Sequence, residues 1–294
     1  MTAITLLDGG MGQELIHRAP EPPTGHFGTK VMIDHPGMVT EVHRDYFRAG
    51  ASIATTNSYA MHHDRFLGTS LEGRQTALIE LALAEAEDAR TAHGSGRIAG
   101  SIGPLVWSYI SDSHPDYETA TALYAEVASI LAPRVDLILC ETVASVEHAR
   151  AVLDGARTTD KPVWVSVTID DENGGVLRSG ELVAELAELE PDAWLANCSA
   201  PEAMADALDV FATWGRPFGA YANGFEEITK AFLNPMSSVD SLTARRDMGP
   251  EIYAKFALEW VGQGATIVGG CCEIGPAHIR EIARQLTVAG HDIV

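Results

Sequence analysis

Short apolar runs alternate along the whole chain with longer segments in which apolar residues recur at helical spacing. The apolar runs have the length of strands that are buried on both faces. The predicted strands are Ile4–Asp8, Ser52–Thr56, Ile98–Ile102, Asp136–Cys140, Val163–Ile169, Ala193–Cys198, Phe218–Tyr221 and Thr266–Gly270. The predicted helices after them are Met38–Phe47, Leu78–Arg90, Thr119–Leu131, Ser145–Leu153, Glu181–Leu189, Glu202–Trp214, Pro250–Val261 and Pro276–Leu286.

Eight strand–helix pairs in 294 residues predict an α/β fold, a (β/α)8 TIM barrel that forms a single domain over residues 1–294. A doubly wound open sheet is the alternative. It fits less well, because the glycines of Asp8–Gly12 lack the spacing of a dinucleotide-binding turn. No linker rich in Pro, Gly or Ser divides the chain, which favours one domain.

Two connections are long, Gln13–Gly37 and Phe225–Gly249. Both leave the carboxyl end of a predicted strand, where barrel active sites lie. Loops of this length in a compact domain are usually lids or subunit contacts. The sequence leaves both roles open, and with them the possibility of a homo-oligomer.

The composition indicates which partners are disfavoured and in which compartment the protein is expected. Forty-one acidic residues against 20 basic ones give a formal charge of −21, which argues against nucleic acid or an anionic membrane as a partner. The apolar runs are too short to span a membrane, and no secretory leader is evident. Four cysteines in a chain of this length do not make a disulfide framework, so a reduced, cytoplasmic setting is expected.

Three cysteines lie at the ends of two predicted strands. Cys198 ends one of them, and Cys271 with Cys272 follows the last. Three thiolates bind zinc well and leave its fourth position open, so we predict a zinc ion that activates a substrate. The alternative is that the cysteines are small buried hydrophobes, and this is the better interpretation of Cys140, which lies within an apolar run. The histidines show no metal-binding pattern, and the pair His62-His63 is interpreted as part of a solvated loop.

Other polar residues follow the predicted strands and should converge on the same mouth of the barrel. They are Asp8, Asn57, Tyr59, Ser101, Glu141 and Asn223. Taken alone, Asp8 and Glu141 are as well explained by a helix cap or a salt bridge beneath a loop. Together, at the mouth of a barrel, the two carboxylates suit the binding of an ammonium group.

Several motifs, in order over essentially the whole chain, resemble the homocysteine S-methyltransferase family. The most specific are the Cys271-Cys272 pair after two glycines and the earlier Asn197-Cys198. The others are Leu7–Gly12 with Glu14-Leu15, Tyr46–Ala51, Thr55–Tyr59, Gly100–Pro104, Glu141-Thr142 and Tyr221–Gly224.

The resemblance implies a (β/α)8 barrel in which Cys198, Cys271 and Cys272 hold zinc and the homocysteine sulfur takes the open position. Asp8, the backbone of Gly9-Gly10, and Glu141 would hold the ammonium and carboxylate of the amino acid. Asn223 or Tyr59 would lie near the open position when substrate is absent.

The implied reaction is an in-line methyl transfer from an onium donor to the zinc-activated thiol, which gives methionine and places the chain in methionine biosynthesis. No catalytic residue beyond this activation is expected. S-methylmethionine is the favoured donor, with betaine or another sulfonium next. Phe225–Gly249 and Trp107–Asp116 depart from the family pattern and are expected to select the donor. A non-catalytic zinc-binding barrel, or a lyase on the same scaffold, is the alternative.

Overall fold

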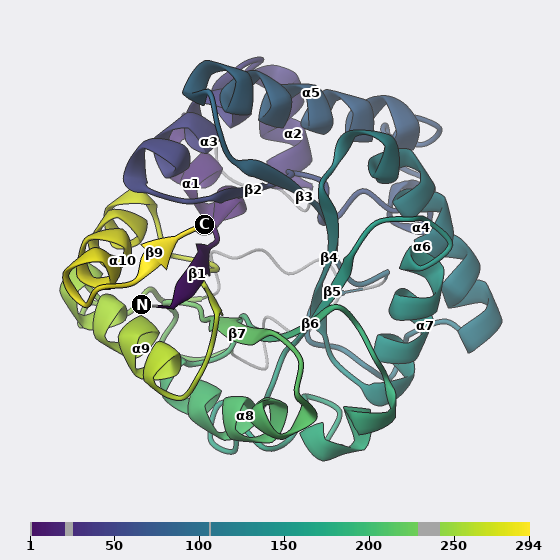
Figure 1. Cartoon of the computed structure of the whole chain (residues 1–294). Coiled ribbons are helices and arrows are strands. Elements are labelled where there is room, and N and C mark those ends of the chain that lie inside the picture. Colours follow the sequence, from purple (N-terminus) through teal and green to yellow (C-terminus); the bar gives the residue numbers. More distant parts are fainter. Residues whose placement is uncertain (1, 21–25, 106, 229–241) are drawn as a thin grey trace.

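The strands form a ring that is surrounded by helices (Figure 1). The computed structural model describes residues 2–20, 26–105, 107–228 and 242–294. These residues form a nine-stranded parallel sheet in the order β2-β3-β4-β5-β6-β7-β8-β1-β9. The strands are β1 (Ala3–Leu6), β2 (Ile53–Thr55), β3 (Arg97–Ile102), β4 (Leu137–Val143), β5 (Val163–Val167), β6 (Ala193–Asn197), β7 (Phe218–Tyr221), β8 (Ile267–Val268) and β9 (Asp292–Ile293).

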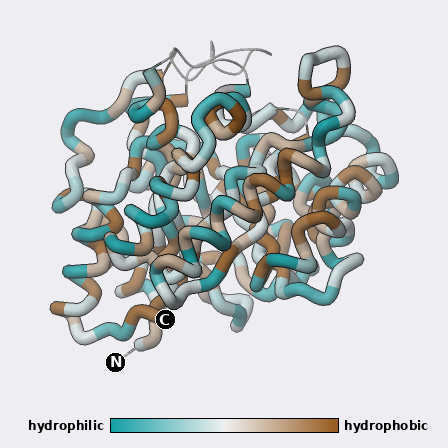
Figure 2. The backbone as a smooth tube through the Cα atoms, turned by 90° about the horizontal axis from the view of Figure 1, so that it is seen from above, coloured by the Kyte–Doolittle hydropathy of each residue, from teal (hydrophilic) through white to brown (hydrophobic). Residues whose placement is uncertain are grey.

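The ring closes between β1 and β2. The N–H of Ser52 donates to the Leu6 carbonyl at 2.8 Å, and its hydroxyl lies 3.2 Å from the same oxygen. The C-terminal strand β9, which the sequence pattern did not predict, pairs with the start of β1, and the N–H of Val294 donates to Ile4 O at 2.9 Å. Both chain ends therefore lie at the same end of the barrel (Figure 2).

Helices cover the outside of the ring, as the TIM-barrel prediction requires. The α-helices are α1 (Met11–Arg18), α2 (Phe27–Asp34), α3 (Met38–Ala49), α4 (His63–Phe66), α5 (Gln75–His93), α6 (Tyr117–Leu131), α7 (Val146–Ala156), α8 (Met204–Phe211), α9 (Pro250–Gly262) and α10 (Pro276–Val288). Short 3-10 helices are η1 (Ala132–Arg134), η2 (Val183–Glu188), η3 (Pro201–Ala203) and η4 (Ala212–Trp214).

The connection Gln13–Gly37 is not the long loop that the sequence suggested. It carries most of α1 and all of α2, so the predicted helix at Met38–Phe47 is the third helix, α3. Helix α1 buries Met11 and Leu15, four residues apart, but it is too short for its periodicity to stand out. Residues 21–25 of this connection, and residues 229–241 of Phe225–Gly249, lie outside the described residues.

The predicted helix Glu181–Leu189 is in fact the 3-10 helix η2. The chain before it folds back on itself in antiparallel bridges that join Ile169 to Leu177 and Val176 to Leu182. Pro191 follows closely and disfavours helical backbone at the residue before it. The helix between these two constraints is therefore short, and it has 3-10 geometry.

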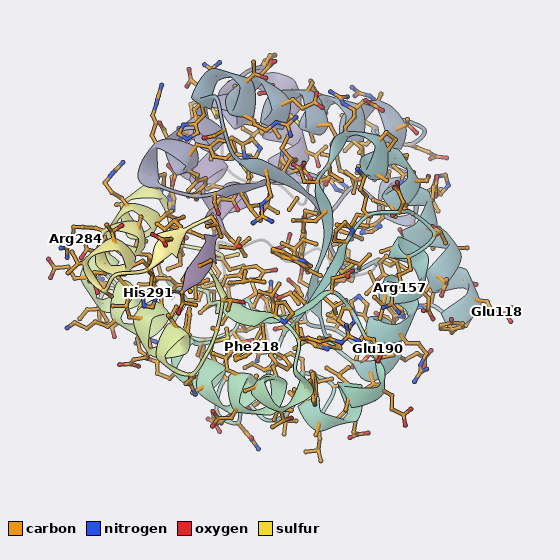
Figure 3. All side chains as sticks on the ribbon, viewed as in Figure 1. Glu118, Arg157, Glu190, Phe218, Arg284 and His291 are labelled. Carbon is orange, nitrogen blue, oxygen red and sulfur yellow. The ribbon has the colours of Figure 1, made fainter. Side chains whose placement is uncertain are left out.

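Two apolar cores flank the strands. The larger lies between sheet and helices and includes Cys140, as predicted. The smaller fills the barrel with Leu7, Ile53, Ala99, Leu137, Leu139, Trp164, Ala193, Leu195, Tyr221 and Ile267. Charged side chains such as Glu118 and Arg284 project from the outer face of the helices (Figure 3). Within the described parts of the chain, no helix combines the length and apolar character that crossing a membrane requires.

Candidate metal centre and substrate pocket

Three cysteine thiols meet at the carboxyl ends of β6 and β8. The Cys198 Sγ lies 2.6 Å from the Sγ of Cys271 and 3.8 Å from that of Cys272. The three sulfurs all lie within 4.8 Å of one another. Of the residues that the structure describes, these form the one group of three His, Cys, Asp or Glu side chains close enough to share a metal ion. The fold therefore brings together the set of thiols that the sequence singled out.

Glycines allow the β1 turn and the cysteine loop to fit together. A Cβ at Gly10 would lie 2.6 Å from the carbonyl oxygen of Cys271, and one at Gly9 would lie 2.0 Å from that of Ile274. The Gly10 N–H donates to Ile274 O at 3.0 Å, and the Gly270 N–H donates to Asp8 O at 3.0 Å. The resemblance assigned the Gly9-Gly10 backbone to the ammonium and carboxylate of the substrate, but the Gly10 N–H already has a partner.

The pKa values of the three thiols are shifted in different directions. Hydrogen bonds from Cys271 and Cys272 hold the pKa of the Cys198 thiol well below its usual range. The pKa values of Cys271 and Cys272 are raised, because each is hydrogen-bonded to Cys198. The cluster therefore resembles one thiolate that two thiols solvate. Because metal ligands must be deprotonated, a metal ion that binds here would release protons.

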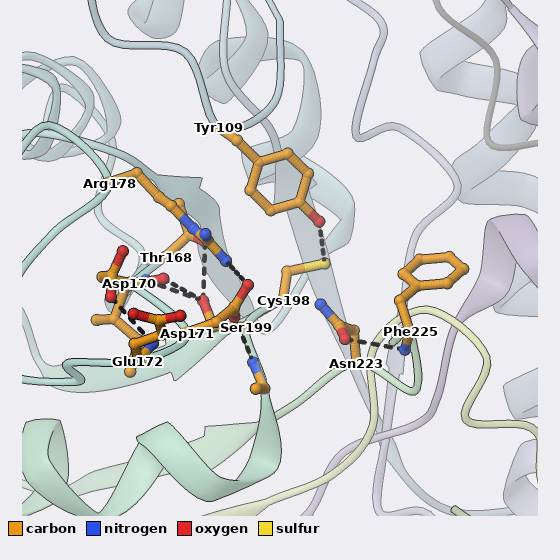
Figure 4. Close-up of polar contacts among 12 residues, drawn as sticks. Tyr109, Thr168, Asp170, Asp171, Glu172, Arg178, Cys198, Ser199, Asn223 and Phe225 are labelled. Atoms are coloured by element: carbon orange, nitrogen blue, oxygen red, sulfur yellow. Dashed lines mark hydrogen bonds and ion pairs between the residues drawn. The ribbon is translucent and has the colours of Figure 1, made fainter. Parts of the chain in front are cut away.

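The cysteines line a pocket of about 260 Å³. Most of the other predicted site residues line it too, namely Asp8, Gly9, Gly10, Asn57, Tyr59, Ser101 and Glu141. Asn223 does not. Its Oδ1 accepts the N–H of Phe225 at 3.1 Å, so this amide holds the chain after β7 in place (Figure 4).

Ser101 lies inside β3, whose end at Ile102 was predicted correctly. Glu141 lies inside β4, which corrects the predicted end of that strand at Cys140. Strand β4 continues to Val143 through a register shift between Cys140 and Val143, and this shift lies where Glu141 enters the pocket. The Ser101 hydroxyl donates to Glu141 Oε1 at 2.5 Å and Tyr221 donates to Oε2 at 3.0 Å. Burial raises the pKa of Glu141 to about 7, although these two hydrogen bonds oppose the rise.

Asp8 is the second buried carboxyl group of the pocket. Its two oxygens accept the N–H and the hydroxyl of Thr55, both at 2.7 Å. Burial raises the pKa of Asp8 to about 7, and the nearby charge of Glu141 adds to the rise. A cation bound between two such carboxyls would favour their charged forms and lower both pKa values.

Asn57 and Tyr59 connect the pocket wall to neighbouring segments. The Asn57 amide donates to Gly28 O at 3.0 Å, which ties helix α2 to the mouth of the barrel. The Tyr59 hydroxyl lies 2.7 Å from that of Ser108. Both side chains therefore shape the wall of the pocket.

Sequence reasoning missed several residues of this region. Tyr221 is the last residue of β7, and in the sequence it stood out only as part of the motif Tyr221–Gly224, with no role of its own. The Tyr109 hydroxyl donates to Cys198 Sγ at 3.1 Å from a segment that no strand pattern places. His43 lies fully buried behind Asp8, with its Nδ1 4.0 Å from Asp8 Oδ2. Arg65 lines the pocket and donates to backbone carbonyls at 2.6 and 3.2 Å.

The interpretation of His62-His63 as a solvated pair was wrong for His62. This ring is buried, and its Nε2 lies 2.8 Å from the carbonyl oxygen of Gly103. Burial lowers the pKa of His62 to about 3, so the ring is neutral at physiological pH. His63, by contrast, is exposed at the start of α4.

A family model for homocysteine S-methyltransferase matches residues 5–286. The chain belongs to this family. It is 29% identical to the homocysteine S-methyltransferase of Escherichia coli K12 over 94% of this chain and 93% of that protein. It is 26% identical to the Bacillus subtilis homocysteine S-methyltransferase YbgG over 95% and 93% of the two chains.

A solved structure extends the similarity to the fold. The homocysteine methyltransferase MmuM from Escherichia coli, in a metallated form, matches with a TM-score of 0.80 and 25% identity over 97% of this chain and 96% of that one. The chain is therefore an enzyme of the homocysteine S-methyltransferase family with a TIM-barrel-like fold. Its cluster of three cysteines has the composition of a metal site.

Proposed function

We propose that residues 1–294 form one homocysteine-binding barrel domain that transfers a methyl group from an onium donor to the sulfur of homocysteine, giving methionine. The observation that carries this proposal is the position of three thiols and two buried carboxyls in the wall of one pocket. The thiols suit a soft metal ion, and the carboxyls suit the ammonium group of an amino acid. A thiol cluster does not require the carboxyls, and the carboxyls do not require the thiols. An amino acid that contains a thiol would contact both.

Zinc is the metal that best fits the donor set. Zinc favours thiolate ligands with a metal–sulfur distance of about 2.3 Å, which corresponds to about 3.8 Å between two ligands of a tetrahedron. The sulfurs of Cys198 and Cys272 already have this separation, whereas those of Cys198 and Cys271, at 2.6 Å, would move apart. When bound, zinc would keep the acceptor thiol deprotonated at neutral pH and therefore nucleophilic.

The carboxyl groups would orient the acceptor. We assign the ammonium of homocysteine to Asp8 and Glu141, which Thr55, Ser101 and Tyr221 hold by hydrogen bonds from the sheet. Rigid placement matters, because a correctly aligned reactant can save roughly 7–11 kcal/mol of the barrier. The acceptor sulfur would then form its bond to the methyl carbon as the donor's bond to that carbon breaks, and the electron pair would leave with the donor.

S-methylmethionine is the donor that we favour, followed by betaine or another sulfonium. All carry an onium group whose positive charge is lost when the methyl group is transferred. The pocket presents two carboxyls together with the aromatic rings of Tyr59 and Phe225, which attract onium groups. Trp107 also lines the pocket, and its ring already faces the guanidinium of Arg65 at 5.8 Å.

A zinc-binding barrel without methyl transfer, or a lyase, would share the thiol cluster but would not need both carboxyls. Metal analysis of the purified protein, followed by titration with homocysteine, separates these functions. We expect zinc, a direct contact between zinc and the homocysteine sulfur, and methionine formation from S-methylmethionine. Zinc without that contact would contradict the methyltransferase assignment, and a panel of sulfonium and ammonium donors would identify the donor.

Cys272→Ala should abolish tight zinc binding and activity while the barrel stays folded. Cys140→Ala is the matched control, because Cys140 packs in the outer core away from the pocket. Normal turnover in Cys272→Ala would show that the metal assignment is wrong. The required thiols are reduced, which is consistent with the expected cytoplasmic location and a place in methionine biosynthesis.

A further inference from the structure

The hydroxyl of Tyr109 lies on one sulfur of the thiol cluster. It donates to Cys198 Sγ at 3.1 Å, and Figure 4 shows the phenol ring aimed at this sulfur. Tyr109 is buried. It comes from the segment between β3 and α6, which is far along the sequence from the strands that carry the cysteines. The contact is therefore a tertiary one, which the fold must hold in place.

The backbone at this tyrosine supports a specific role. Tyr109 has a φ of +70°, in the left-handed region that bulky residues rarely adopt. Cys198 also has a positive φ, of +54°. Both partners of one hydrogen bond thus sit in unfavourable backbone conformations, and such residues cluster at functional sites where their surroundings hold them.

An ion pair holds the ring of Tyr109 from behind. The guanidinium of Arg178 lies 5.6 Å from the ring centroid, and its Nη2 lies 2.8 Å from Asp171 Oδ2. The other oxygen of Asp171 accepts the N–H of Ala200 at 2.7 Å, two residues after Cys198. The contacts therefore form a closed frame, from Cys198 through Ala200, Asp171 and Arg178 to Tyr109 and back to the same sulfur. Figure 4 shows the side chains of Cys198, Asp171, Arg178 and Tyr109.

We propose that Tyr109, placed by the Asp171–Arg178 pair, is a positioning residue of the metal centre whose hydroxyl donates to the Cys198 thiolate and sets how strongly that sulfur binds the metal. This inference rests on the proposed function, since it requires a metal on the cysteines. The hydrogen bond stabilises the charge of a buried thiolate and draws electron density away from the metal. Partners of this kind around a metal ligand typically change metal affinity or activity by about 10- to 100-fold.

Two variants test the roles of the hydroxyl and of the ion pair separately. Tyr109→Phe removes the donor and keeps the ring, whereas Arg178→Gln keeps the donor and removes the cation behind the ring. Tyr117→Phe is the matched control for the first, because its hydroxyl bonds Asp154 on the outside of the barrel. Arg216→Gln is the control for the second, since Arg216 pairs with Glu190 at the surface. Arg178→Lys retains a cation and should restore most of the effect.

The first measurement is zinc affinity by competition with a chelator. We expect Tyr109→Phe to weaken zinc binding by about 10- to 100-fold, because the lost stabilisation of the buried negative charge outweighs the stronger electron donation from the sulfur. Arg178→Gln should weaken zinc binding less. The double variant should be no worse than Tyr109→Phe alone, because Arg178 acts through the tyrosine. If the losses of zinc affinity were additive, Arg178 would have an independent structural role, and the proposal that it acts through Tyr109 would be wrong.

The second measurement is the thiolate-to-metal charge-transfer absorption of the cobalt(II)-substituted protein. Loss of the hydroxyl makes the thiolate a stronger electron donor, so the band should move to longer wavelength in Tyr109→Phe and stay in place in Tyr117→Phe. A variant that is only misfolded would lose intensity without a shift. An unshifted band with unchanged zinc affinity would refute the role of Tyr109, whereas a wild-type protein that binds no metal would instead refute the proposed function.

Discussion

Each buried carboxyl group of the pocket is held by donors that favour its charged form, yet burial keeps its pKa near 7. Glu141 accepts from Ser101 and Tyr221, and Asp8 accepts twice from Thr55. These residues are arranged to be ionised once a cation enters. A positively charged ligand would therefore favour the ionised form of both carboxyls.

Glu141→Gln tests this directly. The amide keeps the shape of the side chain but removes the charge, and a hydrogen bond to a charged group contributes about 1.5–3 kcal/mol. We expect the dissociation constant for homocysteine to rise by about 10- to 100-fold with zinc content unchanged. Calorimetric titration measures this affinity, and Glu118→Gln, on the outer face of α6, is the control. Equal affinity in Glu141→Gln and wild type would remove Glu141 from the site.

The same pKa values predict how binding depends on pH. A carboxyl whose folded pKa is raised to about 7 is largely protonated below that pH, so affinity for an ammonium group should fall as the pH drops from 8.5 to 5.5. Methionine is a suitable probe, because it has the ammonium and carboxylate but no thiol that titrates. In the free protein, the stability that these carboxyls contribute has the opposite dependence on pH from the binding affinity. The contribution of these two carboxyls to the free energy of unfolding is greatest below about pH 4 and is lost as the pH rises to about 7. Affinity that does not change with pH would contradict the assignment of both carboxyls.

At the scale of elements, one hydroxyl joins the segment that carries Tyr109 to helices α6 and α7. Tyr124, on α6, accepts the N–H of Leu105 at 3.3 Å and contacts the Nε2 atoms of His148 at 2.8 Å and His114 at 3.2 Å. The Ala144 N–H donates to His148 Nδ1, so the His148 Nε2 carries the proton and donates to Tyr124. The phenol then donates to His114, and both rings are neutral.

Tyr124→Phe should therefore loosen the segment that carries Tyr109. It leaves buried polar groups of Leu105 and His148 without a partner, which costs about 1–3 kcal/mol. Urea unfolding should show this loss, and hydrogen exchange should show faster exchange in residues 107–116 than in the strands. Tyr117→Phe, at the exposed start of the same helix, should change neither. Uniformly faster exchange over the whole barrel would instead point to a general loss of stability.

The same scale shows what sequence could and could not predict. Strands buried on both faces are continuous apolar runs, so their ends, and with them the places of Asp8, Cys198 and Cys271, could be identified from pattern alone. Helices α1 and α2 and the strand β9 were missed, because they are too short to have a recognisable period. Tyr109 was missed for a different reason. A side chain that reaches a site from a segment without periodic structure has no sequence signal for its position.

At the scale of the whole molecule, the barrel carries a large excess of negative charge. Its 41 acidic and 20 basic residues leave a formal charge of −21. Several of the arginines are already paired with two acids each, such as Arg134 with Glu80 and Glu87, and Arg245 with Glu202 and Asp247. Basic side chains therefore cannot neutralise all of the negative charge, and like charges on the surface repel one another. This repulsion disfavours the compact state.

Salt should accordingly stabilise the protein. The Debye length falls from about 30 Å at 0.01 M to about 10 Å at 0.1 M ionic strength, so most of the long-range repulsion between surface acids is screened in this interval. We expect the midpoint of thermal unfolding to rise steeply up to about 0.1–0.2 M sodium chloride and slowly beyond it, with potassium chloride giving the same curve. Sucrose at matched osmolality is the control, since it stabilises proteins without screening charge.

An unfolding midpoint that does not change with salt over this interval would contradict the prediction. It would mean that the acidic side chains are too far apart, or too well solvated, for their repulsion to affect the fold. A strong effect would show that repulsion among exposed acidic side chains, which added ions can screen, destabilises the fold.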